Sequence, residues 1–349
     1  MHCELVVPAL FAAREVPHLP ALELLLARGQ PAREQALPLE PWIAQAFGLA
    51  ERVLPAGAIT VLADGANGGG SPGDFCWLRA DPVHLRIERD RLALIPSAGF
   101  SISRDEAEAF AAALNRHFDD ELTIFPLRPD CWCLRSARDI ALEASAPVEL
   151  AGQEVNANLP RGPEAARWHA LMNEVQMALH DHPVNLERER RGEPAVNSVW
   201  FWGAGRLPAA ARGLWNSVTA DEPLATGLAR LADLRHRALP ATASDWLERA
   251  PEDGRHLVVL DSLRGALALG GSESHAERLA AMEARWFAPL LDALRHGRID
   301  MVTVRAPDAG VSHETVRGDL RRFWRRARPL GTYCAPVLGD ARSGRIGER

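Results

Sequence analysis

The sequence His182-Pro-Val-Asn-Leu-Glu-Arg-Glu-Arg-Arg-Gly-Glu-Pro-Ala-Val-Asn197-Ser-Val-Trp-Phe-Trp-Gly-Ala-Gly-Arg206 joins a predicted helix to a predicted strand through a long polar connection. Apolar residues recur at helical spacing over 164–180, and the His-Pro pair ends this pattern. The run of valine and aromatic residues after Asn197 predicts a strand, and the glycines that follow it predict a tight turn.

Strands and helices alternate on both sides of this connection. Apolar runs predict strands, and leucine spacing predicts helices; the strands lie at 3–9, 58–63, 256–261 and 301–304, and the helices at 20–28 and 276–296. Such alternation is typical of a parallel sheet with helices on both faces. We assign Glu283 and Asp292 to the solvent face of the long C-terminal helix, and the arginine-rich segment 317–328 to a solvated helix face.

The middle of the chain has a different pattern and begins after the glycine-rich segment 64–73. Ser103 and Glu106 form a capping box that opens a helix to about residue 117. Paired strands are predicted over 75–95, with turns at Asp81-Pro82 and Arg89-Asp90, and further strands at 122–126 and 131–135. We therefore predict an α/β core from residues 1–66 and 186–330, a smaller inserted α+β domain from 72–185, and a polar tail at 331–349.

Composition excludes several functional classes. Hydrophobic residues make up 47% of the 349 residues, yet no apolar run is long enough to span a membrane. The net charge of −6 argues against nucleic acid as a partner. All 40 basic residues are arginine, which excludes a Schiff-base lysine and a Walker-type phosphate loop. The N-terminus lacks the pattern of a secretory signal, so we expect a cytoplasmic protein with reduced cysteines.

The connection quoted above closely resembles a motif of the archaeal-type cofactor-independent phosphoglycerate mutases. In that family a helix ends in His-Pro-x-Asn-x-x-Arg-x-x-x-Gly, which is followed by Pro-Ala-Asn, an apolar strand and Arg-Gly-Ala-Gly. The segment from Gly73 to Arg79, which continues to Asn115, is similar to the opening of the family's substrate domain. A weaker match covers 278–304. From end to end, the chain resembles bacterial regulatory proteins of the RpfE type.

The resemblance implies a doubly wound core like that of alkaline phosphatase, with an inserted domain. It also implies two manganese or zinc ions beside a nucleophilic serine. At the positions where the family carries these groups, we find Leu39 for the serine, Asp261-Ser-Leu-Arg-Gly-Ala266 without a histidine, and Arg305-Ala-Pro-Asp308 for the final ligand motif. The sequence therefore predicts no catalytic residue, no metal ligand and no cofactor. Manganese or zinc would be required only if the protein is an active mutase.

The part of the motif that is retained suggests a ligand site. Its residues are His182, Asn185, Arg188, Asn197, Gly203, Gly205 and Arg206. In one interpretation, Arg188 or Arg206 presents its guanidinium group to an anion. In the other, Asn185, Arg188 and Asn197 satisfy backbone groups of the connection. The family has an arginine before Gly-Ala-Gly, and Trp202 stands there in this chain.

From these residues we predict a catalytically inactive protein with a regulatory or anion-sensing role. Its partner would be a small phosphorylated acid or another protein, and neither nucleic acid nor a membrane. The alternative is a metal-dependent phosphoglycerate mutase, or a related phosphotransferase or phosphatase, with an altered site. An altered, metal-free chemistry would require a cluster of polar groups in the cleft between the predicted core and the inserted domain. No such cluster can be identified from the sequence.

Overall fold

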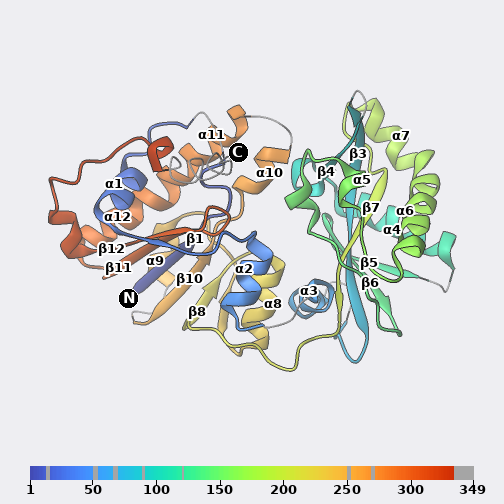
Figure 1. The fold of residues 1–349 in the computed structure, drawn as a ribbon, viewed down its shortest axis with the longest axis horizontal. Coiled ribbons are helices and arrows are strands. Elements are labelled where there is room, and N and C mark those ends of the chain that lie inside the picture. Colours follow the sequence, from blue (N-terminus) through green and yellow to red (C-terminus); the bar gives the residue numbers. More distant parts are fainter. Residues whose placement is uncertain are drawn as a thin grey trace, which may run out of the picture.

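The computed structural model describes residues 1–12, 16–49, 54–65, 70–88, 91–119, 122–249, 253–268 and 272–333. Within these residues, the chain forms two sheets, and each is the centre of one lobe (Figure 1). We call the part around the seven-stranded sheet the larger lobe, and the part around the five-stranded sheet the smaller lobe. No helix in the described ranges has the length and apolar character that a membrane span requires.

The larger lobe has a mostly parallel sheet in the order β2-β12-β11-β1-β10-β8-β9. Its strands are β1 (His2–Val6), β2 (Gln30–Arg33), β8 (Ser217–Thr219), β9 (Arg235–Arg237), β10 (Arg255–Val259), β11 (Met301–Ala306) and β12 (Val311–Val316). The five strands from β11 to β9 run parallel, and β12 and β2 add an antiparallel edge. Three strands predicted from apolar runs are confirmed as β1, β10 and β11.

Helices cover both faces of this sheet. They are α1 (Pro20–Arg28), α2 (Leu39–Ala46), α3 (Ala56–Asp64), α8 (Pro223–Leu231), α9 (Ala243–Arg249), α10 (Leu263–Ala268), α11 (Ser272–Met282) and α12 (Ala288–His296). Successive side chains of a strand point to opposite faces, so Leu5 packs with α1 and α12, whereas Val6 packs with α2 and α8. The mixed α/β architecture that the alternation predicts is therefore confirmed.

The smaller lobe has an antiparallel sheet with helices on it. Its strands are β3 (Cys76–Glu88), β4 (Arg91–Pro96), β5 (Thr123–Arg128), β6 (Cys131–Ser136) and β7 (Ser198–Gly205). Its helices are α4 (Arg104–Phe118), α5 (Val155–Asn158), α6 (Ala165–His180) and α7 (Pro183–Arg190), with 3₁₀ turns at Ser97–Gly99 and Pro147–Leu150. The predicted capping box is confirmed: Ser103 Oγ accepts from the Glu106 N–H, and the Glu106 carboxylate accepts from the Ser103 N–H.

The prediction of a strand at 58–63 is wrong, because these residues lie in α3. This helix lies between the lobes, and every residue from Ala56 to Val61 is buried. A helix that is buried all round shows no helical period, so its sequence cannot be told from that of a buried strand. Small residues make this position possible: a Cβ atom on Gly57 would lie 2.5 Å from Leu78 Cα, and one on Gly227 would lie 2.2 Å from the Ile59 carbonyl oxygen.

Two features of β3 also differ from the prediction. The strand continues through Asp81-Pro82 without a turn. Pro82 is tolerated because, among the described strands, residues 80–82 pair with β7 alone, so the missing N–H interrupts no second ladder there. Since β7 pairs with β3, residues 198–205 lie in the smaller lobe, whereas the boundary at 186 assigns them to the core. Arg89 and Asp90 lie outside the described residues, as do 66–69 and 334–349.

The arginine-rich segment near the C-terminus does not form the expected solvated helix. Only Arg317–Arg321 is helical, as a 3₁₀ turn, and a second such turn follows at Leu330–Tyr333. Arg322 and Arg325 donate hydrogen bonds to the carbonyl oxygens of Arg28 and Gly29 at the end of α1. Their positive charges therefore lie where the helix dipole of α1 is negative.

The long helix predicted over 276–296 consists of α11, a π-helical turn at Glu283–Phe287 and α12, and Gly297 caps its end in the left-handed conformation. Glu283 is buried, so its assignment to the solvent face is wrong, whereas Asp292 is exposed. The Glu283 carboxylate accepts from the N–H groups of Ala21 and Leu22, at 2.6 and 3.2 Å. It therefore caps α1, whose own N-cap residue Leu19 has no side-chain acceptor.

We expect Glu283→Ala to lower the free energy of unfolding by about 1–2 kcal/mol, because two buried N–H groups lose their acceptor. Glu283→Gln keeps one carbonyl acceptor and should lower the free energy of unfolding by a smaller amount. Urea unfolding of the three proteins would measure the difference. The matched control is Asp292→Ala on the same helix, and an equal loss in that exposed variant would contradict the capping role.

Candidate functional site

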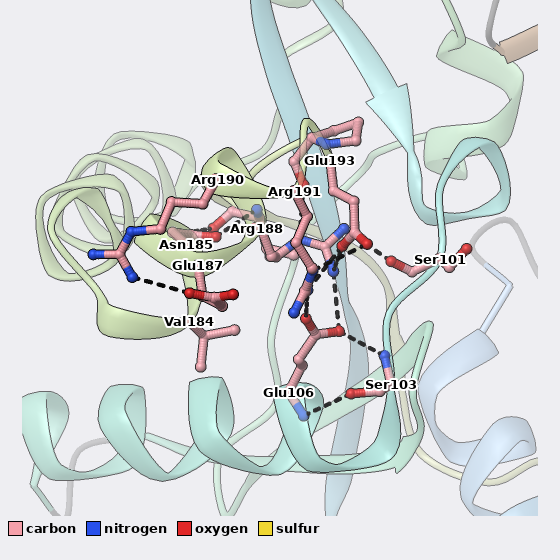
Figure 2. A network of polar contacts seen from close by, with 12 residues as sticks. Ser101, Ser103, Glu106, Val184, Asn185, Glu187, Arg188, Arg190, Arg191 and Glu193 are labelled. Atoms are coloured by element: carbon pink, nitrogen blue, oxygen red, sulfur yellow. Dashed lines mark hydrogen bonds and ion pairs between the residues drawn. The ribbon is translucent and has the colours of Figure 1, made fainter.

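Arg188 lies in a closed polar network rather than in a cavity (Figure 2). Its side chain is 1% exposed, and all three guanidinium nitrogens are used. Nε donates to the Pro194 carbonyl, Nη2 to the Ser101 carbonyl and Nη1 to the Glu106 carboxylate, at 2.8, 2.8 and 3.0 Å. In this arrangement Arg188 ties the end of α7 to the start of α4, and each nitrogen that could face an anion already donates within the chain.

The neighbouring predicted residues also bind backbone groups. Asn185 donates to the carbonyl oxygens of Leu179 and Val196 and accepts from the Val196 N–H. Asn197 binds both the N–H and the carbonyl of Leu85. His182 caps α7 through Nδ1 and packs against the Phe110 ring. The interpretation in which these residues satisfy the backbone of the connection describes the observed contacts.

The two glycines and Arg206 lie at the other end of β7. Gly203 and Gly205 have φ angles of 61° and 158°, and Cβ atoms there would lie 2.4 Å from Ala56 and 2.6 Å from Pro55. They therefore let β7 approach the start of α3. Arg206 is exposed, and its guanidinium group donates to Asp139 and to the Asp74 carbonyl.

The described residues enclose a cleft of about 330 Å³ between the lobes, and none of the predicted site residues lines it. The larger lobe contributes residues that follow β8 and β10, which are at the carboxyl ends of parallel strands, where α/β proteins commonly bind ligands. The charged residues that line the cleft, from both lobes together, are Glu40, Arg79, Asp81, Arg128, Asp130, Asp221, Glu222, Asp261, Arg264 and Arg278.

On the smaller-lobe wall, Arg79 and Asp81 form a buried ion pair. Arg79 donates from Nε and Nη2 to Asp81 Oδ1, at 2.9 and 2.7 Å, and from Nη1 to Thr60 Oγ1 on α3. The Trp202 indole N–H donates to the other carboxylate oxygen at 2.7 Å, and the indole ring lies against the guanidinium group. Trp202, which stands in place of the family's arginine, is therefore part of the cleft wall.

On the larger-lobe wall, carboxyl groups surround Arg264. Its Nη2 donates to both oxygens of Glu40, at 2.7 and 2.8 Å. Burial raises the pKa of the Glu222 carboxyl to about 7 and also raises the pKa of Asp261. Burial together with the neighbouring Glu40 charge raises the pKa of Glu149 to about 8. Glu149 belongs to the smaller lobe and contacts Glu40, so this acidic cluster includes a residue of each lobe.

Two arginines of this wall have donors to spare. Arg264 uses only Nη2, and Arg278 uses only Nη1, which donates to the Ser262 carbonyl at 2.6 Å. Within the described ranges, the remaining N–H groups of both side chains have no acceptor. These two guanidinium groups could therefore bind an oxyanion, whereas Arg188 could not.

The cleft residues do not fit the two metal ions that the family resemblance implies. No group of three or more histidine, cysteine, aspartate or glutamate side chains suited to a metal occurs in the described part of the chain. Both oxygens of Glu40 accept from Arg264, and those of Glu222 accept from the Leu224 and Ala225 N–H groups of α8. A cation beside Arg264 would also be repelled by its positive charge.

Most of the cleft could not be found from the sequence. In the sequence, Arg264 belongs to the segment that replaces a histidine motif and Glu40 directly follows Leu39, and no pattern marks either as a site residue. The available signal was a polar residue directly after each predicted strand, which marks the carboxyl edge of a parallel sheet. By that rule Asp261 could be found, whereas β8 is only three residues long and its Asp221 and Glu222 were missed.

No protein-family model matches this chain. A probable 2,3-bisphosphoglycerate-independent phosphoglycerate mutase of Geobacter sulfurreducens is 34% identical over 93 residues, which cover 25% of this chain and 23% of that protein. The corresponding mutase of Methanosarcina mazei is 30% identical over 115 residues, covering 32% and 29%. The chain thus matches about a quarter of the length of these relatives, and over that part it is distantly homologous to them.

Among solved structures, the PH0037 protein of Pyrococcus horikoshii is similar over 99% of both chains, with a TM-score of 0.54 and 14% sequence identity. At this identity the likeness concerns the fold alone. It agrees with the mixed α/β architecture that the alternating strands and helices predicted.

Proposed function

We propose that this protein is a catalytically inactive relative of the phosphoglycerate mutases and binds a small phosphorylated acid in the cleft between its lobes. The observation that carries the proposal is the Glu40–Arg264 ion pair at the start of α2, where the resemblance places the nucleophile and its metals. Leu39 and a guanidinium group stand there in place of a hydroxyl and two cations. The role would be regulatory, as the resemblance to the RpfE-type proteins implies, and the protein would act in the cytoplasm, as expected from its N-terminal sequence.

The spare donors of Arg264 and Arg278 support the choice of an oxyanion. A guanidinium group offers parallel N–H groups that match the geometry of carboxylates and phosphates. The cleft volume of about 330 Å³ is at the small end of the range of ligand pockets, which suits a three-carbon acid. Arg264 and Arg278, rather than Arg188 and Arg206, would therefore bind the anion.

The carboxyl groups of Glu222, which lines the cleft, and of Glu149, which contacts the lining residue Glu40, set the pH dependence of this binding. When Glu222 and Glu149 lose their protons, each adds a negative charge that repels an anion. Their pKa values of about 7 and 8 place this change near neutral pH. Binding of a phosphorylated acid should therefore strengthen as the pH falls through these two values, which a titration of Kd against pH would measure.

Thermal unfolding with 2- and 3-phosphoglycerate, phosphoenolpyruvate and inorganic phosphate tests the proposal. At about 100-fold excess over Kd, a bound ligand adds about 2.7 kcal/mol to the free energy of unfolding. We expect this stabilisation in the wild type and its loss in Arg278→Gln. The control is Arg190→Gln, whose side chain is 73% exposed and which should keep the shift. No shift with any of these anions at millimolar concentration would contradict the binding role.

A metal analysis and a mutase assay of the purified protein test the inactivity. We expect no turnover and no tightly bound metal. About two manganese or zinc ions per chain, the number that a two-metal mechanism requires, would overturn this part of the proposal, whatever the outcome of the binding experiment.

A second candidate function is an enzyme with altered, metal-free chemistry. The convergence of Glu222, Asp261 and Arg264 in the cleft favours it, because a carboxyl group with a pKa of about 7 can exchange a proton at neutral pH. Conversion of a phosphorylated acid by the wild type, with loss of conversion in Glu222→Gln, would establish this function in place of the regulatory one.

A further inference from the structure

An apolar groove continues from the interlobe cleft along the larger lobe. It has a volume of about 390 Å³ and lies between the segment 239–241, which follows β9, and the helix α11 with its π-helical turn. Leu260, which follows β10, also lines it. The cleft and the groove therefore lie along the same carboxyl edge of the parallel sheet, and Ser262 and Arg278 line both.

Two hydrogen bonds hold the residues where the cleft meets the groove. Arg278 Nη1 donates to the carbonyl oxygen of Ser262 at 2.6 Å. The Leu239 N–H donates to the Asp221 carboxylate at 3.0 Å, and of these two residues Leu239 lines the groove and Asp221 lines the cleft. A ligand held by the remaining N–H groups of Arg278 would therefore lie next to both hollows.

The groove differs from the cleft in its chemistry. Apolar residues make up most of its wall, and they include Leu239, Pro240, Leu260, Ala281, Met282 and Trp286. The charged residues of the described chain that line the groove are Arg278 and Arg285, and no acidic residue is among them. Met282 and Trp286 are each 5% exposed, so a ligand would mainly contact the partly exposed Leu239 and Pro240 and the exposed Ala281. The groove thus offers an apolar surface without negative charge, directly beside Arg278.

We propose that the ligand of the cleft is an organic phosphate that carries an apolar substituent, and that this substituent lies in the groove. The inference rests on the proposed binding of an anion by Arg264 and Arg278, and it names the class of the ligand. A bare three-carbon acid would leave the apolar wall exposed to water. An alkyl group attached to the phosphate would cover this wall, and its burial would add to the affinity.

A series of alkyl phosphates tests the groove. Isothermal titration calorimetry of the full chain would measure Kd for inorganic phosphate and for methyl, butyl and hexyl phosphate. A methylene group that is about half buried tightens binding about twofold. After the cost of ordering the chain, hexyl phosphate should bind about tenfold more tightly than methyl phosphate. Butyl phosphate should lie between them.

Two neighbouring alanines of α11 provide a matched pair of variants. Ala281 and Ala280 are both exposed, and of the two only Ala281 lines the groove. In Ala281→Gln, the longer polar side chain would occupy the groove, so the preference for hexyl over methyl phosphate should fall to about twofold or less. Ala280→Gln makes the same change outside the groove and should keep the preference of the wild type.

Two results would overturn this inference and leave the proposed anion site in place. The first is a Kd for hexyl phosphate equal to that for methyl phosphate in the wild type. The second is an undiminished preference for hexyl phosphate in Ala281→Gln. If inorganic phosphate, the alkyl phosphates and the phosphoglycerates all fail to bind, the anion site itself is contradicted, and both proposals fall together.

Discussion

Replacing Arg188 by alanine should lower the free energy of unfolding by about 3–5 kcal/mol, the range found when one partner of a buried ion pair is removed. The variant leaves the Ser101 and Pro194 carbonyls and one oxygen of Glu106 without the Arg188 donor. It also opens a cavity beside the Phe100 ring, which lies 5.7 Å from the guanidinium carbon. Urea unfolding followed by tryptophan fluorescence would measure the loss.

Arg190 provides the matched control on the same helix. Its side chain is 73% exposed, and its one ion-pair partner in the described part of the chain is Glu187, which is 51% exposed. An exposed pair of this kind contributes less than about 1 kcal/mol, so Arg190→Ala should unfold almost like the wild type. An Arg188→Ala variant that is as stable as Arg190→Ala, and that no longer responds to phosphorylated acids, would restore Arg188 as a ligand-binding residue.

Replacing Asp81 by asparagine should lower the free energy of unfolding by about 3 kcal/mol, because the substitution keeps the shape of the side chain and leaves the Arg79 charge buried without its counter-ion. The asparagine side chain has a single carbonyl oxygen for the donors of both Arg79 and Trp202, so one of these donors loses its acceptor. Because these groups form the wall of the cleft, anion binding there should weaken as well. Urea unfolding and the thermal shift with phosphorylated acids would measure the two effects.

Glu88 on the same strand serves as the control. It pairs with Arg86 and Arg91 at the exposed end of β3, where water replaces a lost partner. Glu88→Gln should therefore leave the unfolding midpoint almost unchanged. Equal unfolding midpoints for Asp81→Asn and Glu88→Gln would contradict a stabilising role of the buried Arg79–Asp81 pair.

Local signals in the sequence predicted much of the fold. The capping box of Ser103 and Glu106, the glycine that ends α12 and the apolar strands β1, β10 and β11 all depend on residues close together in the chain. Local patterns fail where a segment is enclosed on all sides. The helix α3 and the capping residue Glu283 are of this kind, because their surroundings come from distant parts of the chain.

The same distinction between local and distant residues applies to the candidate site. The polar connection from His182 to Arg206 stood out in the sequence because its residue types occur in a fixed order, and in the structure Asn185, Arg188 and Asn197 hold backbone groups. The partners of Arg188 include Ser101 and Glu106, which precede it by 87 and 82 residues. No local pattern indicates that these groups occupy the nitrogens of its guanidinium.

The sequence by itself determined the alternation of strands and helices, the start of α4, the absence of lysine chemistry and the distant relationship to the phosphoglycerate mutases, because each follows from residue type and short-range spacing. Only the tertiary structure decided which arginine side chains already donate their hydrogen bonds within the chain and which keep N–H groups for a ligand. Glu40 and Arg264 are 224 residues apart in the chain, yet they form one ion pair where the two lobes meet. Hydrogen bonds between side chains depend on distances of about 3 Å, and the packing of the whole chain sets these distances.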